Sequence, residues 1–97
     1  MDTQARIRNL RDTDKTRKHL RFRRRKQIEA DTGMPRSTLY DAIRRGVWPP
    51  PIRLGANSVA WLDHESQAVI AARAAGKSDD QIRGLVKELV AARSEAI

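Results

Sequence analysis

The sequence predicts a mainly α-helical fold that contains one small β-hairpin and ends in an additional helix. Two observations carry most of this prediction. Four segments are predicted to be helices from their helix-start residues, from a glycine that ends them, or from both: residues 24–32, 35–45, 63–75 and 78–92. Residues 52–61 instead alternate apolar with polar side chains on either side of a turn, as a hairpin does. The chain has 97 residues, so all of these elements fit into one small domain.

The first two predicted helices are short and adjacent. The first occupies residues 24–32, and Gly33 closes it because glycine readily adopts the positive φ common after a helix. Pro35 is expected in the first turn of the second helix, where its missing N–H would have no partner, and Gly46 ends that helix. The apolar face of the second helix consists of Leu39, Ala42 and Ile43. Two short helices joined by a glycine turn are typical of a helix-turn-helix unit, whose second helix enters the major groove of DNA.

The segment after Gly46 changes to extended structure. Three consecutive prolines, residues 49–51, forbid a helix and favour an extended chain. The hairpin strands then fall within residues 52–61, and residues 55–57 supply the turn. A hairpin that directly follows a recognition helix is a wing. The sequence therefore predicts a winged helix-turn-helix.

Two further helices follow the predicted hairpin. Asp63 is expected to cap the third helix, and Ser78 with Gln81 forms a capping-box pattern for the fourth. The fourth helix carries an apolar stripe made of Ile82, Leu85, Val86, Leu89 and Val90. This stripe must be buried, either by packing within the chain or by contact with another protomer, and the sequence leaves these two alternatives open.

Positive charge is concentrated near the N-terminus. The formal net charge is +8, yet residues 28–97 hold nine basic and nine acidic residues, whereas residues 1–27 hold eleven and three. Such a charge calls for a polyanionic partner. We expect a flexible basic N-terminal arm at residues 1–20, a DNA-binding domain at residues 21–76 and a C-terminal helix at residues 77–97 for packing or oligomerisation. Five side chains that continue the basic arm are expected to contact phosphates rather than only solubilise the chain: Arg21, Arg23, Arg24, Arg25 and Lys26.

Composition also excludes several kinds of site. The absence of Cys excludes disulfides, thiolate zinc sites and a Cys nucleophile. His19 and His64 lie far apart in the sequence, so metal ligation is not expected, and Asp79 with Asp80 is interpreted as a pair of first-turn acids. Phosphate-loop and nucleophile motifs are missing from the sequence. We expect a non-enzymatic protein with no cofactor, no small-molecule ligand and no membrane contact, located in the bacterial cytoplasm with the nucleoid.

A series of motifs between residues 21 and 74 keeps a distinctive order and spacing. It comprises Arg25-Lys26-Gln27-Ile28, Thr32-Gly33-Met34-Pro35-Arg36-Ser37-Thr38-Leu39-Tyr40, Ile43, Gly46, Trp48-Pro49, Pro51-Ile52-Arg53-Leu54-Gly55 and Val59-Ala60-Trp61-Leu62. This series resembles the AlpA-type regulators of phages and mobile elements. The resemblance implies a winged helix-turn-helix related to MerR-type and excisionase domains, acting in transcriptional activation, in integrase-directed excision, or in both. Pro35 stands where the family usually has Ser, so the free N–H groups at this helix start would need Ser37, water or a phosphate.

The second helix carries most of the candidate DNA contacts. They are Arg36, Ser37, Thr38, Tyr40, Arg44 and Arg45. Arg36 can pair with guanine in bidentate fashion, while Ser37 and Thr38 either contact phosphate or cap the helix. Tyr40 is assigned equally to DNA contact and to the edge of the core. The two C-terminal arginines either contact phosphate or stabilise the negative end of the helix dipole.

In the wing, Arg53 and Asn57 are the candidate contacts to the minor groove or its phosphates, with a solvated strand face as the alternative for Arg53. Trp48 and Trp61 are interpreted as core residues rather than as platforms for unpaired bases, because both are embedded among apolar residues.

The resulting functional hypothesis is a sequence-specific binder of double-stranded DNA from a mobile element. It would act as an excisionase, that is, a recombination directionality factor, as a transcriptional activator, or as both, by bending and occupying an attachment site or a promoter. Expected partners are DNA, other copies of the chain on DNA, and a tyrosine-type integrase or RNA polymerase. The alternatives are a plain transcriptional regulator without a recombination role and a helix-mediated interaction protein with nonspecific affinity for nucleic acid.

Overall fold

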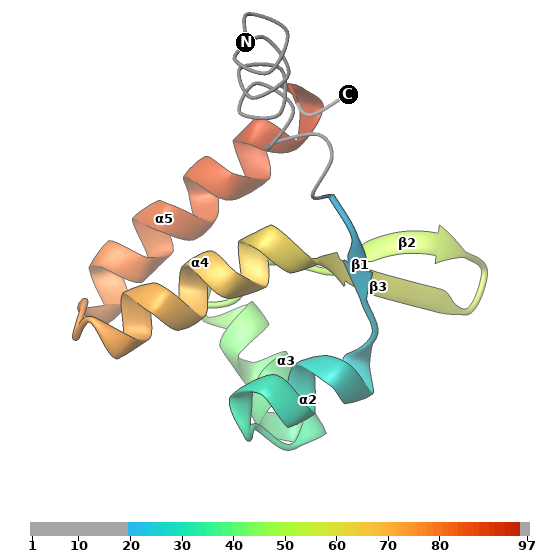
Figure 1. Cartoon of the computed structure of the whole chain (residues 1–97), viewed down its shortest axis with the longest axis horizontal. Helices are drawn as coiled ribbons and strands as arrows, with labels where there is room; N and C mark the ends of the chain where they lie inside the picture. Colours follow the sequence, from blue (N-terminus) through green and yellow to red (C-terminus); the bar gives the residue numbers. More distant parts are fainter. Residues whose placement is uncertain (1–19, 96–97) are drawn as a thin grey trace, which may run out of the picture.

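The computed structural model describes residues 20–95. The elements in chain order are β1 (Phe22–Arg23), α2 (Arg25–Thr32), α3 (Arg36–Arg44), β2 (Ile52–Gly55), β3 (Ser58–Leu62), α4 (Asp63–Ala74), α5 (Asp79–Ala91) and a short 3-10 helix, η1 (Ala92–Glu95). Helices α2 and α3 form the helix-turn-helix, and strands β2 and β3 form the wing that projects from it (Figure 1). The predicted fold class is confirmed. The basic arm expected at residues 1–20 lies outside the described residues, except for Leu20.

The sheet has one strand more than the sequence predicted. Its order is β1-β3-β2, with both pairs antiparallel. In the first pair Phe22 lies opposite Leu62 and Arg23 opposite Trp61, and the Asp63 backbone N–H donates to the Arg21 carbonyl over 2.7 Å. A two-residue strand carries no periodic signal of its own, because only its distant partner defines it. Residues 21–23 therefore belong to the folded domain.

Two predicted helix starts are shifted by one position. Pro35 was expected in the first turn of α3 but is the extended residue before it, with φ −70° and ψ 166°. Asp63 was expected as the cap of α4 but is its first helical residue, and the cap position belongs to Leu62. The reason in the second case is that β3 runs directly into α4, so the last strand residue supplies the extended backbone that a cap requires. Predicted helix ends at Gly33, Gly46 and Gly76 agree with their positive φ values.

One hydrophobic core connects helices α2, α3, α4 and α5 with strand β3. It contains Ile28, Leu39, Ala42, Val47, Trp48, Trp61, Val69, Ile82 and Val86. From α5, Ile82 and Val86 are buried, while Leu85, Leu89 and Val90 are half-buried and pack against the core. Ser78 and Gln81 form the predicted capping box at the start of this helix. The apolar stripe of α5 thus lies against α4 and the core (Figure 1).

Within residues 20–95, the structure contains no helix that is long and apolar enough to cross a membrane.

Candidate nucleic-acid interface

The first turn of α3 is exposed and polar. Arg36, Ser37 and Thr38 are all exposed, and no side chain among the described residues caps the free N–H groups of this helix. The N-terminal end of a helix carries partial positive charge and free N–H donors, which suit an anionic group such as a phosphate. The Arg36 guanidinium lies 6.0 Å from the centre of the Tyr40 ring, an arrangement that favours a cation–π contact. This turn therefore combines a charged side chain, two hydroxyls and free backbone donors.

Tyr40 joins this exposed turn to the wing. Its ring is half-buried and meets Trp61 of β3 edge to face, with centroids 6.4 Å apart and an interplanar angle of 65°. Trp61 is fully buried, and its Nε1–H donates to the Pro49 carbonyl over 2.9 Å. The contact holds α3 against β3, so Tyr40 has a structural role at the edge of the core and also lies beside Arg36.

The two arginines at the C-terminal end of α3 share a carboxylate. Arg44 Nη2 lies 2.9 Å from Asp41 Oδ1, and Arg45 Nε lies 3.0 Å from Asp41 Oδ2. Arg45 Nη1 also lies 3.7 Å from Asp79 Oδ2 on α5. The side chain of Arg44 is 72% exposed, compared with 50% for Arg45. Arg44 is thus the more available of the two for a phosphate.

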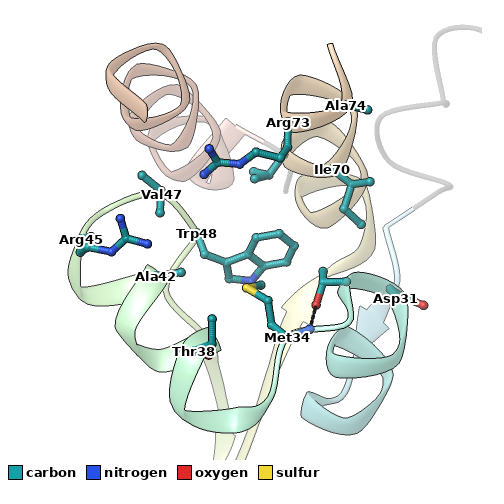
Figure 2. Close-up of a pocket in the computed structure, with 12 residues that line it drawn as sticks. Asp31, Met34, Thr38, Ala42, Arg45, Val47, Trp48, Ile70, Arg73 and Ala74 are labelled. Atoms are coloured by element: carbon teal, nitrogen blue, oxygen red, sulfur yellow. Dashed lines mark hydrogen bonds between the residues drawn. The ribbon is translucent and has the colours of Figure 1, made fainter. Parts of the chain in front are cut away.

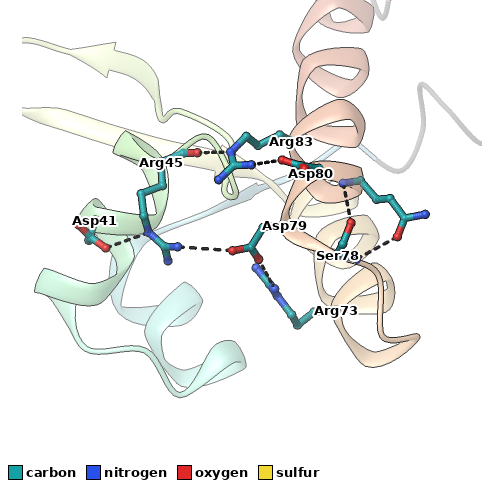
Figure 3. A network of polar contacts seen from close by, with 8 residues as sticks. Asp41, Arg45, Arg73, Ser78, Asp79, Asp80 and Arg83 are labelled. Atoms are coloured by element: carbon teal, nitrogen blue, oxygen red, sulfur yellow. Dashed lines mark hydrogen bonds and ion pairs between the residues drawn. The ribbon is translucent and has the colours of Figure 1, made fainter.

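Helix α5 contacts the end of α3 through charged groups (Figure 3). Arg83 Nε donates to the backbone carbonyl of Arg45 over 2.9 Å, and Asp79 binds Arg73 over 2.8 Å. The hydrogen bond from Arg73 lowers the pKa of Asp79 below its ordinary value, against the opposing effect of desolvation, and the nearby charges of Arg45 and Arg83 lower it further. The sequence analysis assigned Asp79 only to the helix dipole and did not single out Arg83. Their partners lie more than thirty residues away or on another helix, which no local pattern reveals.

The other end of α5 is attached to the segment that leads into the wing. Arg93, in η1, binds both carboxylate oxygens of Glu65, at 2.9 and 2.7 Å, and donates to the Pro50 carbonyl over 2.8 Å. Glu65 is fully buried. Arg83 and Arg93 therefore hold residues 45–50, which connect the recognition helix to the wing, from two sides. The sequence analysis did not identify Arg93 either.

The wing carries the two residues predicted from the sequence. Arg53 is exposed on β2, and Asn57 is exposed in the turn before β3. Leu54, between them, is also 43% exposed. The wing thus presents one cation, one amide and one apolar side chain on a narrow projecting element.

The basic residues before α2 fall into two groups. Arg23 binds Asp31 over 2.7 Å and lies 3.8 Å from Asp63, and Arg25 is paired with Glu29 in the same helix. The exposed side chains of Arg21, Arg24 and Lys26 form no ion pair with another described residue. All five lie within the folded domain, in β1, at its flanks and at the start of α2. Within this group, the charges of Arg21, Arg24 and Lys26 are the ones left for a phosphate.

Among residues 20–95, no group of three or more His, Asp or Glu side chains is arranged to hold a metal ion.

Comparison with known proteins gives a family match and a similar phage protein. A family model described as "Prophage CP4-57 regulatory protein (AlpA)" matches residues 21–73, from β1 through most of α4. A protein of Enterobacteria phage P4, described as "Uncharacterized protein ORF88", is 44% identical over 57 residues. That match covers 59% of this chain and 65% of the phage protein. No solved structure matches. Because the family model covers more than half of the chain, including the helix-turn-helix and the wing, the chain belongs to the AlpA family of phage-associated, DNA-binding regulators.

Proposed function

We propose that the chain binds a specific duplex DNA site, with α3 in the major groove and the wing against an adjacent minor groove. The observation that carries this proposal is the first turn of α3. There Arg36, Ser37 and Thr38 are exposed together at an uncapped helix start, on the second helix of a helix-turn-helix. Direct base contact falls to Arg36, and the hydroxyls with the free N–H groups contact phosphate.

We further propose that this binding serves a mobile element, as a recombination directionality factor, as a transcriptional activator, or as both. Support comes from membership of a family of prophage regulatory proteins and from similarity to a phage P4 protein. The mechanism is architectural: several copies on adjacent sites would bend the DNA at a modest deformation cost per site and would contact an integrase or RNA polymerase.

A DNase footprint across the attachment site and the neighbouring promoter of the element tests site-specific binding. We expect protection at one or both, with further repeats protected as protein concentration rises. Arg36→Ala is the test variant and Lys87→Ala is the matched control, because it removes one exposed charge from α5 instead. Absence of a protected site in both regions would refute the proposal.

Two assays separate the proposed roles. Excision of the element by its integrase, measured with and without this chain, reports a recombination role. A promoter reporter without integrase measures transcriptional activation. A plain transcriptional regulator changes only the reporter, whereas a recombination directionality factor changes the yield of excised element.

A helix-mediated interaction protein is less well supported than a DNA binder. That alternative requires the apolar stripe of α5 to bind a partner helix. Two of its side chains, Ile82 and Val86, are buried in the core, and the other three pack against it. A partner helix would have to displace the core contacts of α5 first.

A further inference from the structure

A cavity of about 460 Å³ lies behind the recognition helix (Figure 2). Five parts of the chain contribute to it: the C-terminal end of α2, the turn between α2 and α3, helix α3 with the residue after it, the segment Val47–Trp48, and the C-terminal half of α4. Its apolar lining comprises Met34, Ala42, Val47, Trp48, Val69 and Ile70. Pockets for small molecules typically have volumes of about 300 to 1,000 Å³ and a mostly apolar lining with a few polar groups. The cavity fits this description.

A buried donor in this lining lacks an acceptor. The Trp48 side chain is 97% buried, yet its Nε1–H has no hydrogen-bond partner among the described residues. The Nε1–H of Trp61, in contrast, donates to the Pro49 carbonyl. Buried polar groups are nearly always hydrogen-bonded, because an unpaired one forfeits its hydration without compensation. This nitrogen has almost no accessible surface, so it does not open onto the cavity; the indole ring itself lies in the middle of the cavity-lining side chains (Figure 2).

The cavity has guanidinium groups on one side. Arg45 and Arg73 both line it, at the edge formed by α3 and α4 (Figure 2). Each is about half exposed, and each is also an ion-pair partner of Asp79. A guanidinium has five N–H donors, so Arg73 has donors left beside its pair with Asp79, and Arg45 beside its pairs with Asp41 and Asp79. On the opposite side, the carboxylate of Asp31 is already paired with Arg23.

We propose that this cavity binds a small organic carboxylate with an apolar body, and that binding alters the DNA affinity of α3. The apolar body lies against Trp48 and Ile70, and the carboxylate pairs with Arg45 and Arg73. Thr38 and Arg45 both line the cavity and belong to the candidate DNA contacts, so an occupant changes their surroundings directly. The second half of this inference rests on the proposed DNA binding, whereas the first half does not. The sequence analysis expected no small-molecule ligand; the residues that line the cavity lie on segments far apart in the sequence, which no local pattern links.

The two indole N–H groups provide an internal comparison for a binding test. The ¹⁵N-labelled full chain is titrated with 3-phenylpropionate, with its neutral amide 3-phenylpropanamide, and with acetate. We expect 3-phenylpropionate to shift the Trp48 indole resonance in a saturable way and to shift the Trp61 resonance less, because Trp48 lines the cavity and Trp61 does not. The amide should bind about tenfold more weakly, since it lacks the charge-assisted bonds. Acetate should leave both resonances unchanged at the same concentrations.

A pair of exposed alanines on α4 supplies the variants. Ala74 lines the cavity and Ala71 does not, although both are exposed on the same helix. Ala74→Phe should fill the opening and abolish the Trp48 shift, whereas Ala71→Phe should bind 3-phenylpropionate as the wild type does. Trp48→Phe assigns the Trp48 indole resonance. An unshifted Trp48 resonance, or equal binding by the two alanine variants, would overturn the proposed ligand site.

A gel shift with and without 3-phenylpropionate then tests the link to DNA. We expect a change of several-fold in the apparent Kd of the wild type and of Ala71→Phe, and no change for Ala74→Phe. Saturable binding without any change in Kd would overturn the regulatory half and leave the site intact. If the wild type binds no duplex at all, the proposed function fails, and the indole titration still decides whether the cavity binds the ligand.

Discussion

Arginines on the recognition helix differ mainly in what already binds them. Arg36 faces an aromatic ring and has no carboxylate partner among the described residues. Arg45 lies within ion-pair distance of Asp41 and Asp79, and its carbonyl accepts from Arg83. A phosphate or base must compete with these carboxylates for Arg45 but not for Arg36. Specific recognition is therefore expected to depend more on Arg36 than on Arg45.

Replacement of Arg36 by alanine should relax sequence specificity. Loss of a bidentate base contact is expected to cost about 1–3 kcal/mol at the cognate site and much less at sites altered in the contacted base pair. Arg21→Ala is the matched control, because Arg21 is exposed and outside the recognition helix; it should weaken binding to all duplexes equally and lower the salt dependence. Binding constants for the footprinted site and its single-base variants, measured over a salt series, check this. Equal losses at every sequence for both variants would contradict the assigned division of roles.

Removal of Arg93 should destabilise the fold strongly. Glu65 is fully buried, and Arg93 binds both of its carboxylate oxygens. Arg93→Ala leaves an uncompensated buried charge, for which a loss of about 3–5 kcal/mol in the free energy of unfolding is expected. Urea unfolding followed by tryptophan fluorescence measures this loss.

The double variant Glu65→Leu with Arg93→Met is the informative control. It removes both charges and keeps apolar volume, so it should recover most of the stability lost in the single variant. Lys87→Ala, which removes an exposed charge from α5, should leave stability unchanged within about 0.5 kcal/mol. A double variant as unstable as Arg93→Ala would show that packing, not charge, dominates at this position.

At the scale of the elements, the N-terminal end of α5 supports the C-terminal end of α3. Arg83 Nε donates to the Arg45 carbonyl, one of the helix-end acceptors that α3 itself leaves without a helical partner. The Arg83 side chain also passes over Gly46, whose positive φ turns the chain toward the wing. The contact therefore stabilises the turn that sets the direction of the wing relative to the recognition helix.

Arg83→Ala should loosen this turn without unfolding the chain. Loss of the partly exposed hydrogen bond to the Arg45 carbonyl is expected to cost about 0.5–1.5 kcal/mol, and loss of the exposed ion pair with Asp80 adds little. Amide hydrogen exchange should speed up at Gly46 and Val47, whose N–H groups donate to carbonyls within α3, and should stay unchanged in α2. Lys87→Ala serves again as the charge control. Unchanged exchange at the Gly46 and Val47 amides would show that the turn after α3 is stable without the contact from α5.

The ion pair between Asp79 and Arg73 should make part of the free energy of unfolding depend on pH in the acidic range. The pKa of Asp79 is lowered in the folded chain, so its contribution is fully present above the unfolded value of about 3.9 and is lost as pH falls through the lower folded value. The stability difference between wild type and Asp79→Asn should thus be constant near neutral pH and narrow below about pH 4. Unfolding curves at successive pH values measure it. In chains that also carry Arg73→Gln, the stability difference between Asp79 and Asp79→Asn should change much less with pH. A wild-type difference in stability that stays constant down to about pH 2 would refute the role of the Asp79–Arg73 pair.

How far each element could be predicted depends on how local its determinants are. The capping box of Ser78 and Gln81 lies within four residues, and Gly33 and Gly46 mark helix ends by their own backbone freedom, so the sequence predicts these features. Strand β1 is defined only by its pairing with β3, forty residues away, and leaves no pattern. The one-residue shift at Asp63 arises because β3 and α4 are continuous, which composition does not indicate.

The candidate site shows the same contrast between local and distant determinants. Exposure of Arg36 and Ser37 follows from the helical phase set by Leu39 and Ala42, and the sequence predicts it. The pairing of Arg23 with Asp31 and of Arg93 with Glu65 depends on tertiary packing. Charge counts alone therefore overstate the number of cations that are available for DNA.

At the scale of the whole molecule, positive charge and recognition are distributed differently along the sequence. Residues 28–97 are neutral as a set, and the excess of eight positive charges lies in residues 1–27. In the described part of that segment, Arg21, Arg24 and Lys26 form no ion pair with a described residue, and they adjoin the helix-turn-helix. Nonspecific attraction to DNA is thus expected to depend on the N-terminal segment, and site selection on α3 and the wing.

Helix α5 lies outside the region that matches the family, yet the fold is expected to depend on it. A chain that ends at Gly76 loses the buried side chains of Ile82 and Val86, and it leaves Glu65 without Arg93. Loss of one buried aliphatic side chain alone costs about 2–5 kcal/mol, which is comparable to the whole stability of a small domain.

We therefore expect the truncated chain to lose its cooperative thermal transition and the near-ultraviolet circular dichroism of Trp48 and Trp61. The full chain with Lys77→Ala and Lys87→Ala, which keeps every core contact of α5, should retain both signals. A truncated chain that melts at the same Tm as the full chain would show that residues 21–76 fold alone, and α5 would then be free to bind a partner.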